Sequence, residues 1–135
     1  MTPEAAGYLE KARRCLEYAR VNLSVELGND AGRNAYLAAF HAAQALIFES
    51  TGRIAKTHQG VQAEFSRLTR GDPAIPADLR RFLSQAYNLK AVADYEAGPD
   101  AEVPVDRAVL ALAGAKQFVG WVEQRLSPSS GYAAS

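Results

Sequence analysis

A short polar segment before the middle of the chain carries side chains suited to binding a phosphate. It reads Arg53-Ile54-Ala55-Lys56-Thr57-His58 and lies between two apolar, helix-like segments. Backbone N–H groups at a helix start hold anions well, and Lys56 and Arg53 would add positive charge there. His58 could move protons near neutral pH. The competing interpretation is a helix cap with solvated charges, and the pattern leaves both open.

A second group of polar side chains follows further along, between Tyr87 and Tyr95. Spacings of three and four residues place Tyr87, Lys90 and Asp94 on one side of a helix. Lys90 and Asp94 can therefore form an ion pair. The default interpretation of such a pair is a surface salt bridge, worth at most about 1 kcal/mol.

His41 is the third candidate, because it lies in an otherwise apolar segment. From Ala35 to Phe48 only His41 and Gln44 are polar. A histidine in such surroundings is costly unless its ring nitrogens find hydrogen-bond partners. We favour a hydrogen-bonded histidine in the core or at a dimer seam, because no catalytic partner is evident nearby.

Several other kinds of site are excluded by the absence of their motifs. The sequence has no Glu-x-x-His, no His-Glu-x-x-His, no paired cysteines, no phosphate-binding glycine loop and no dinucleotide fingerprint. We therefore expect neither a metal nor a cofactor. The single cysteine, Cys15, cannot form an internal disulfide, which fits a reducing cytoplasm.

Charge and hydropathy restrict the partners. The chain of 135 residues has 15 Lys and Arg against 15 Asp and Glu, so a general attraction to polyanions is not predicted and any such contact must be local. The first residues have neither a basic nor an apolar signal region, and no apolar run reaches about 20 residues, so we expect no secretory signal and no membrane span. We expect a cytoplasmic protein that does not contact a membrane.

The element that must organise these groups is the apolar segment from Asn34 to Phe48. Five alanines let neighbouring helices approach closely: Ala38, Ala39, Ala42, Ala43 and Ala45. A helix that is apolar all round has neighbours all round. We therefore interpret this segment as the central rod of a helical bundle.

Apolar side chains at spacings of three and four predict the other helices. The first runs from about Pro3 to Leu27, with Gly28 as its left-handed cap, and the second from about Ala31 to Ser50. A short third helix opens at Thr57 or His58, a fourth starts between Pro76 and Asp78, and the last extends from Pro104 or Asp106 to about Leu126. The predicted fold is all-α, an up-down antiparallel four-helix bundle with an additional short helix. It forms one domain, residues 1–126, followed by a disordered tail, residues 127–135.

The last helix has a second apolar strip, made of Leu110, Gly114, Phe118 and Trp121. A helix on the outside of a bundle needs only one apolar strip. The extra strip packs internally or forms a dimer contact, and the pattern does not distinguish these alternatives.

Three segments together resemble the HEPN domain proteins. They are residues 34–43 (Asn-Ala-Tyr-Leu-Ala-Ala-Phe-His-Ala-Ala), Gly52 followed by Lys56-Thr57-His58-x-Gly60, and Leu89-Lys90-x-x-Ala93-Asp94-Tyr95. The most similar group is the small stand-alone prokaryotic one that is often paired with a minimal nucleotidyltransferase. The resemblance covers about Ala5 to Leu126 and implies a helical bundle that forms a homodimer.

The resemblance also implies an activity. Many members are toxins of toxin–antitoxin pairs that cleave RNA without a metal, using an arginine followed after four to six residues by a histidine. Here Lys90 stands in the place of that arginine, and Asp94-Tyr95 follows without a histidine. Arg53-x4-His58 has the spacing but lies in the preceding loop. Lysine keeps the charge but loses the bidentate fork to phosphate.

Two hypotheses follow. In the first, the protein is a toxin-like ribonuclease in which His58 transfers the proton, Lys90 holds phosphate and Asp94 orients Lys90. Tyr95 and Lys56 would contact RNA or a nucleotide, with Arg53 and His41 as further contacts. In the second, it is an inactive dimeric scaffold that binds a nucleotide or a protein.

Overall fold

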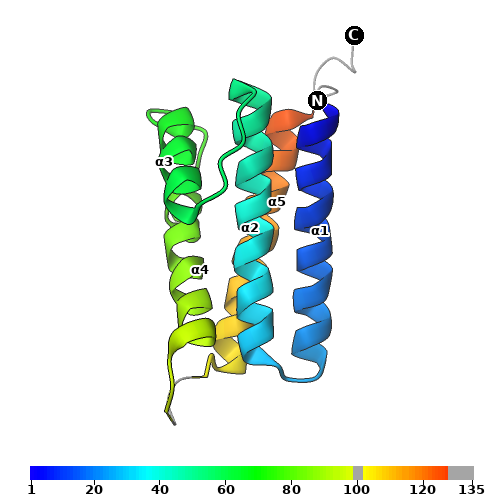
Figure 1. Cartoon of the computed structure of the whole chain (residues 1–135), viewed down its shortest axis with the longest axis vertical. Coiled ribbons are helices and arrows are strands. Elements are labelled where there is room, and N and C mark those ends of the chain that lie inside the picture. Colours follow the sequence, from blue (N-terminus) through cyan, green and yellow to red (C-terminus); the bar gives the residue numbers. More distant parts are fainter. Residues whose placement is uncertain (99–101, 128–135) are drawn as a thin grey trace.

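The computed structural model describes residues 1–98 and 102–127, and within them every regular element is a helix (Figure 1). The helices are α1 (Pro3–Ser24), α2 (Gly28–Thr51), α3 (His58–Thr69), α4 (Ala77–Tyr95) and α5 (Val105–Leu126). The four longer helices run along the long axis of the molecule, and the short α3 packs against α2 and α4. The all-α bundle with a short additional helix, expected from the sequence, is confirmed.

Helix α2 is the central element, since it packs against each of the other four helices. The five alanines that predicted this role are completely buried: Ala38, Ala39, Ala42, Ala43 and Ala45. Their small side chains allow the backbones of adjacent helices to approach closely. The core of the molecule therefore forms around α2.

The turn between α1 and α2 differs from the prediction. Helix α1 ends at Ser24, and α2 begins at Gly28 rather than Ala31. The residue with a positive φ is Glu26, at 60°, so Gly28 is not the left-handed cap. Gly28 instead allows a close approach, because a Cβ atom on it would overlap the carbonyl oxygen of Val103. Beside it, the backbone N–H of Val103 donates to Asn29 Oδ1 at 2.7 Å, which attaches the segment before α5 to the start of α2.

The second apolar strip of α5 divides between the core and the surface. Phe118 is completely buried, and its ring centroid lies 5.1 Å from that of Phe65 and 6.1 Å from that of Phe82. Gly114 leaves room for the Phe82 ring, which a Cβ atom would overlap. Leu110, in contrast, is 69% exposed. Internal packing therefore explains Phe118 but not Leu110.

One prediction falls mostly on residues that the structure does not describe. The disordered tail was expected over residues 127–135, of which 128–135 lie outside the described part. Residues 99–101, between α4 and α5, also lie outside it. Among the described helices, none combines the length and apolarity that crossing a membrane requires.

Candidate functional site

Three helices bring the polar candidates together at one side of the bundle. Helix α2 contributes Tyr36 and Arg33, the first residue of α3 is His58, and the second half of α4 contributes Tyr87, Lys90 and Asp94. These six residues are referred to below as the α2–α4 site. Their contacts with one another form a continuous chain from His58 to Arg33.

His58 is held in place by the start of α3. Thr57 caps this helix, with its Oγ1 accepting a hydrogen bond from the Gly60 N–H at 2.9 Å. The His58 ring then stacks on the Tyr87 ring with centroids 3.8 Å apart and planes 13° apart. Its Nδ1 lies 2.9 Å from the hydroxyl oxygen of Tyr36. Burial lowers the pKa of His58, and the nearby charge of Lys90 lowers it further, so the neutral imidazole is favoured.

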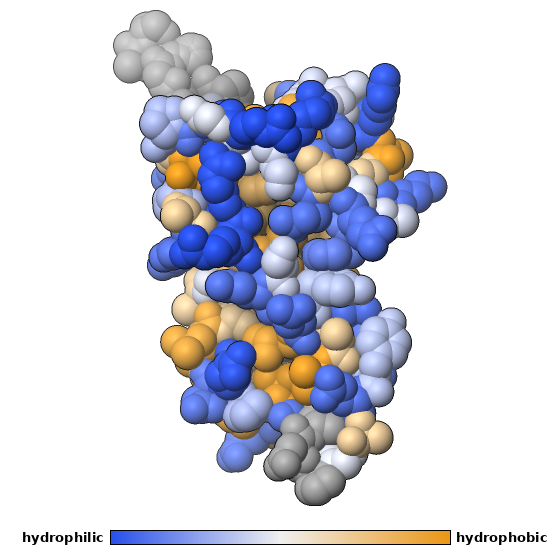
Figure 2. All heavy atoms as spheres, turned by 90° about the vertical axis from the view of Figure 1, so that its left-hand side faces the viewer, coloured by the Kyte–Doolittle hydropathy of each residue, from blue (hydrophilic) through white to orange (hydrophobic). Residues whose placement is uncertain are grey.

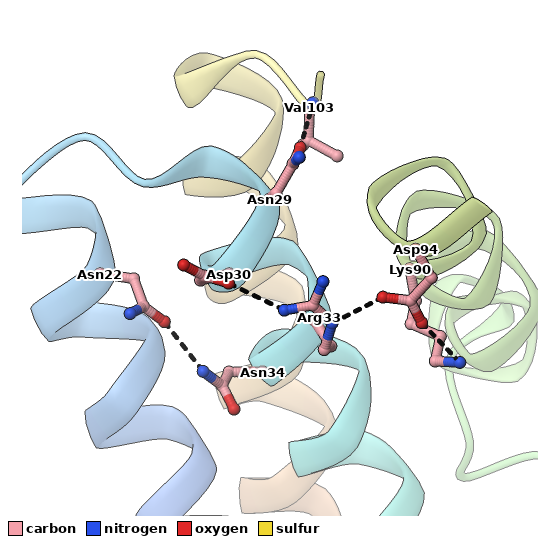
Figure 3. A network of polar contacts seen from close by, with 8 residues as sticks. All are labelled: Asn22, Asn29, Asp30, Arg33, Asn34, Lys90, Asp94 and Val103. Carbon is pink, nitrogen blue, oxygen red and sulfur yellow. Dashed lines mark hydrogen bonds and ion pairs between the residues drawn. The ribbon is translucent and has the colours of Figure 1, made fainter. Parts of the chain in front are cut away.

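Asp94 joins two cations from different helices (Figure 3). Its Oδ2 lies 2.8 Å from Lys90 Nζ and its Oδ1 lies 2.7 Å from Arg33 Nε. The Arg33 guanidinium also reaches Asp30 Oδ1 at 2.8 Å. Hydrogen bonds from Lys90 and then Arg33 hold the pKa of Asp94 below its usual range, and the bond to Asp94 raises the pKa of Lys90. All three groups are therefore charged at neutral pH.

Lys90 lies between aromatic rings as well as beside a carboxylate. Its Nζ is 5.9 Å from the ring centroid of Tyr87 and 5.3 Å from that of Tyr95, distances at which a cation is attracted to a ring face. Tyr95 is 74% exposed, so most of its surface is open to a ligand. The arrangement combines fixed positive charge with an exposed aromatic surface.

The structure brings together five of the residues named from the sequence: His58, Tyr87, Lys90, Asp94 and Tyr95. Arg53 and Lys56 lie in the exposed segment that leads to α3, and neither side chain makes an ion pair with another described residue. The charge of Arg53 contributes to lowering the pKa of Glu64, after the stronger effect of Arg67. Both side chains are therefore exposed and not held by a carboxylate of the described residues.

His41 has a different environment. Its Nδ1 lies 2.8 Å from Gln44 Oε1, and Gln44 Nε2 donates to the carbonyl oxygen of Ala55 at 2.8 Å. Burial lowers the pKa of His41, against a smaller opposite effect of its bond to Gln44. These contacts do not include any residue of the α2–α4 site. They favour the hydrogen-bonded core histidine over a ligand-binding role.

Arg33 and Tyr36 are the members of the site that the sequence did not indicate. Arg33 follows Asp30 by three residues, which looks like an ordinary surface pair on one helix. Tyr36 looks like one more apolar residue of the central helix. One signal was available, because a tyrosine buried among alanines still needs a partner for its hydroxyl. The sequence does not show which residue that partner would be.

No group of three or more His, Cys, Asp or Glu side chains within residues 1–98 and 102–127 is arranged to hold a metal ion. The site presents cations and aromatic rings instead. A lysine, an arginine and a neutral histidine can contact the oxygen atoms of a phosphate, and tyrosine rings can contact a base.

Fold and site define a helical-bundle protein with a polar site at the junction of α2, α3 and α4. The model of the HEPN domain matches residues 5–125, and the chain therefore belongs to the HEPN domain family.

A solved structure has the same fold. The chain is similar to the protein TT1696 from Thermus thermophilus, whose crystal structure superposes with a TM-score of 0.78 at 25% sequence identity, covering 93% of this chain and 100% of that one. No curated protein matches the sequence. The resemblance of the three sequence segments to HEPN proteins is thus confirmed at the level of family and fold.

Proposed function

We propose that the α2–α4 site binds the phosphate groups of RNA or of a nucleotide, and that the protein is the HEPN member of a pair with a minimal nucleotidyltransferase. The observation that carries the proposal is the meeting of Lys90 and Arg33, from two different helices, on the two oxygens of Asp94. Cations held in place at a partly buried position interact with phosphate more strongly than cations in free solution. Asp94 and Asp30 balance these two charges, so the net positive charge that a chain of zero net charge needs here comes from Arg53 and Lys56.

The site also suits the rest of a nucleotide. Tyr95 is exposed next to Lys90, and a base stacked on an aromatic ring typically gains about 1–3 kcal/mol. Arg53 and Lys56 are close in sequence to His58 and extend the positive charge along the α3 start. A single-stranded segment therefore fits the site better than a duplex, whose bases are stacked on one another.

The test is a binding measurement with a fluorescent single-stranded RNA and, separately, with nucleotides. Lys90→Gln should weaken RNA binding about tenfold, since a hydrogen bond to a charged group contributes about 1.5–3 kcal/mol. Lys116→Gln removes an exposed lysine of α5 and is the matched control for the change in net charge. If both variants bind as tightly as the parent, the α2–α4 site is not where RNA binds.

Metal-independent RNA cleavage is the second candidate. It is favoured by the convergence of His58, Lys90 and Asp94, with His58 and Lys90 both next to the Tyr87 ring. Such a reaction needs a proton-transfer group and a cation at the phosphate. Cleavage of RNA in the presence of EDTA that is lost in His58→Ala would support it. A His58→Ala variant that cleaves as fast as the parent would remove His58 from the mechanism.

A homodimer is part of the proposal, and the groove between α4 and α5 is where we place the second copy. Leu79, Phe82 and Leu89 line one side of the groove, and the exposed Leu110 lines the other. Figure 2, which views the side where α3 and α4 lie, shows apolar side chains at the surface of its lower half.

The charges along this groove suit a two-fold arrangement. Asp78 lies at one end and Arg107 at the other, because α4 and α5 run in opposite directions. A second copy related by a two-fold axis would place its Arg107 near Asp78, which also pairs with Arg81 of its own helix. Opposite charges at the two ends favour this self-complementary orientation.

Leu110→Glu should convert such a dimer to a monomer in analytical ultracentrifugation without unfolding it, because Leu110 is exposed in the single chain. Val21→Glu, at an exposed position of α1, is the control.

The nucleotidyltransferase partner is tested separately, by co-expressing the protein encoded next to this chain and purifying the complex. If no complex forms, the proposed partner is wrong, whereas the RNA-binding proposal is unaffected.

A further inference from the structure

The hydroxyl of Tyr36 is buried, and its position determines what His58 can do. Tyr36 is 3% exposed and packs against Phe40 and Tyr87, with ring centroids 5.7 and 5.5 Å away. Its oxygen lies 2.9 Å from His58 Nδ1, and no other described residue offers it a hydrogen bond. The two side chains come from α2 and from the first residue of α3, 22 positions apart in sequence.

The direction of this hydrogen bond follows from the protons available. Burial raises the pKa of Tyr36 well above its usual value, so the phenol keeps its proton. A buried hydroxyl that does not donate costs about 1–3 kcal/mol. The O–H group therefore donates to Nδ1, which must be the ring nitrogen without a proton. In a neutral imidazole the proton then belongs to Nε2.

We propose that Tyr36 fixes His58 as the neutral tautomer with its proton on Nε2, and that His58 thereby donates a hydrogen bond to an oxygen atom of the bound phosphate or base. Tyr36 is a positioning residue, since it acts through His58. The inference rests on the proposed function for the identity of the ligand, whereas the tautomer itself is a property of the free protein.

The surroundings of His58 favour the same state. The stacked Tyr87 ring fixes the plane of the imidazole. A ring flip would place a carbon atom, which cannot accept, next to the Tyr36 hydroxyl. A charged imidazolium would place its Nδ1–H opposite the Tyr36 O–H and leave one of these two donors without an acceptor. Lys90, the charged group that acts on His58 from α4, also disfavours a second positive charge there.

This tautomer counts against His58 as a general base. A base needs a free lone pair on the nitrogen that faces the substrate. Here the lone pair of Nδ1 already accepts from Tyr36, and Nε2, which has no hydrogen-bond partner among the described residues, carries the proton. Donation to a ligand oxygen makes use of that N–H without any change of tautomer. The geometry thus supports binding over the cleavage candidate.

The direct test is an NMR measurement of the ¹⁵N shifts and long-range couplings of the His58 ring in the free protein at neutral pH. We expect a protonated Nε2 and an unprotonated Nδ1. Tyr36→Phe should bring His58 to a mixture of both tautomers and raise its pKa, because the donor that favours the neutral ring is gone. Tyr87→Phe keeps the stacked ring and the Tyr36 hydroxyl, and should leave the tautomer unchanged. A protonated Nδ1 in the parent protein would overturn the inference, whether or not Tyr36→Phe folds.

The donor role is tested by two variants of His58. The amide of glutamine can place an N–H close to the position of Nε2, whereas alanine cannot. His58→Gln should bind single-stranded RNA within about threefold of the parent, and His58→Ala should bind about tenfold more weakly. Equal losses in both would overturn the donor role.

The two proposals fail in different ways. RNA that does not bind at all, with the proton found on Nε2, would refute the proposed function and leave the tautomer assignment intact. RNA that binds through Lys90, with the proton found on Nδ1, would refute the inference and leave the proposed function intact.

Discussion

The middle and the beginning of α2 use the same helix for different purposes. From Ala38 to Ile47 every residue except His41 is buried, five of them are alanines, and neighbouring helices pack directly on this segment. The first turns instead form directional bonds to other elements, through Asn29 to Val103, Arg33 to Asp94 and Tyr36 to His58. The middle fixes how the helices pack, and the beginning fixes where the polar groups of α3 and α4 are held.

The difference shows why one region could be recognised in the sequence and the other could not. Close packing depends on side-chain size, which each residue of the chain reveals by itself. A hydrogen bond depends on two partners, and those of Arg33 and Tyr36 lie 61 and 22 positions away. The two regions should therefore respond differently to substitution, the middle of α2 to volume and its beginning to charge and proton position.

The largest effect is expected for an increase of volume in the middle of α2. Ala42 is completely buried, so Ala42→Leu has no space for its extra methylene and methyl groups. We expect a loss of about 1–3 kcal/mol in the free energy of unfolding, measured by urea denaturation. Ala6→Leu, at an exposed position of α1, should change it by less than about 0.5 kcal/mol. Equal effects of the two substitutions would contradict the close packing around α2.

At the α2–α4 site, removal of a charge should affect stability and binding in opposite directions. Asp94→Asn leaves Lys90 and Arg33 without the carboxylate between them, and we expect a loss of about 1–2 kcal/mol in the free energy of unfolding. The two cations become available to a ligand, so phosphate or RNA should bind several-fold more tightly. Urea denaturation and RNA titration check the two effects.

The pH dependence of this stability difference has a definite sign. The folded state lowers the pKa of Asp94, whose ordinary value is 3.8, so its contribution is fully present above that pH. It is lost as the pH falls through the folded-state pKa, since the protonated carboxyl no longer attracts the cations. Parent and Asp94→Asn should therefore become equally stable in acid. A stability difference that is independent of pH would show that the effect of the substitution is not electrostatic.

A smaller effect is expected where α3 positions His58. Thr57→Ala removes the oxygen that accepts from the Gly60 N–H, which should cost about 1 kcal/mol of stability. The His58 ring should also become more mobile, which ¹⁵N relaxation would detect. Thr57→Ser retains the oxygen and is the matched control. Unchanged stability and unchanged relaxation in Thr57→Ala would show that the Tyr36 bond and the Tyr87 stack hold His58 without the cap.

The sequence predicted the bundle well because the apolar spacing of each helix is local. It also predicted that Lys90 and Asp94 share one side of α4, since this follows from helix geometry alone. The proximity of this pair to His58 depends on how α3 packs against α4, which the spacing of residues along one helix does not reveal. The family resemblance suggested this proximity instead. The prediction for Gly28 was wrong because a glycine after a helix usually signals a left-handed cap. Here the absence of a side chain leaves room for the carbonyl group of Val103, which lies just before α5.

The smallest effect concerns the titration of the two histidines. Burial lowers the pKa of both His58 and His41 relative to 6.5, so the unfolded chain takes up protons at a higher pH than the folded one. The stability that their neutral forms contribute is fully present above 6.5 and is lost as the pH falls through that value toward the lower folded-state pKa of each ring. His58→Gln should reduce this pH-dependent loss in the free energy of unfolding, measured by urea denaturation, by less than about 1 kcal/mol, the net size of one hydrogen bond. His41 should account for the rest of the loss. The stability of the double variant His41→Asn/His58→Gln should then not change with pH between the range where carboxylates titrate and neutral pH. A slope that persists in the double variant would show that other groups control stability near neutral pH.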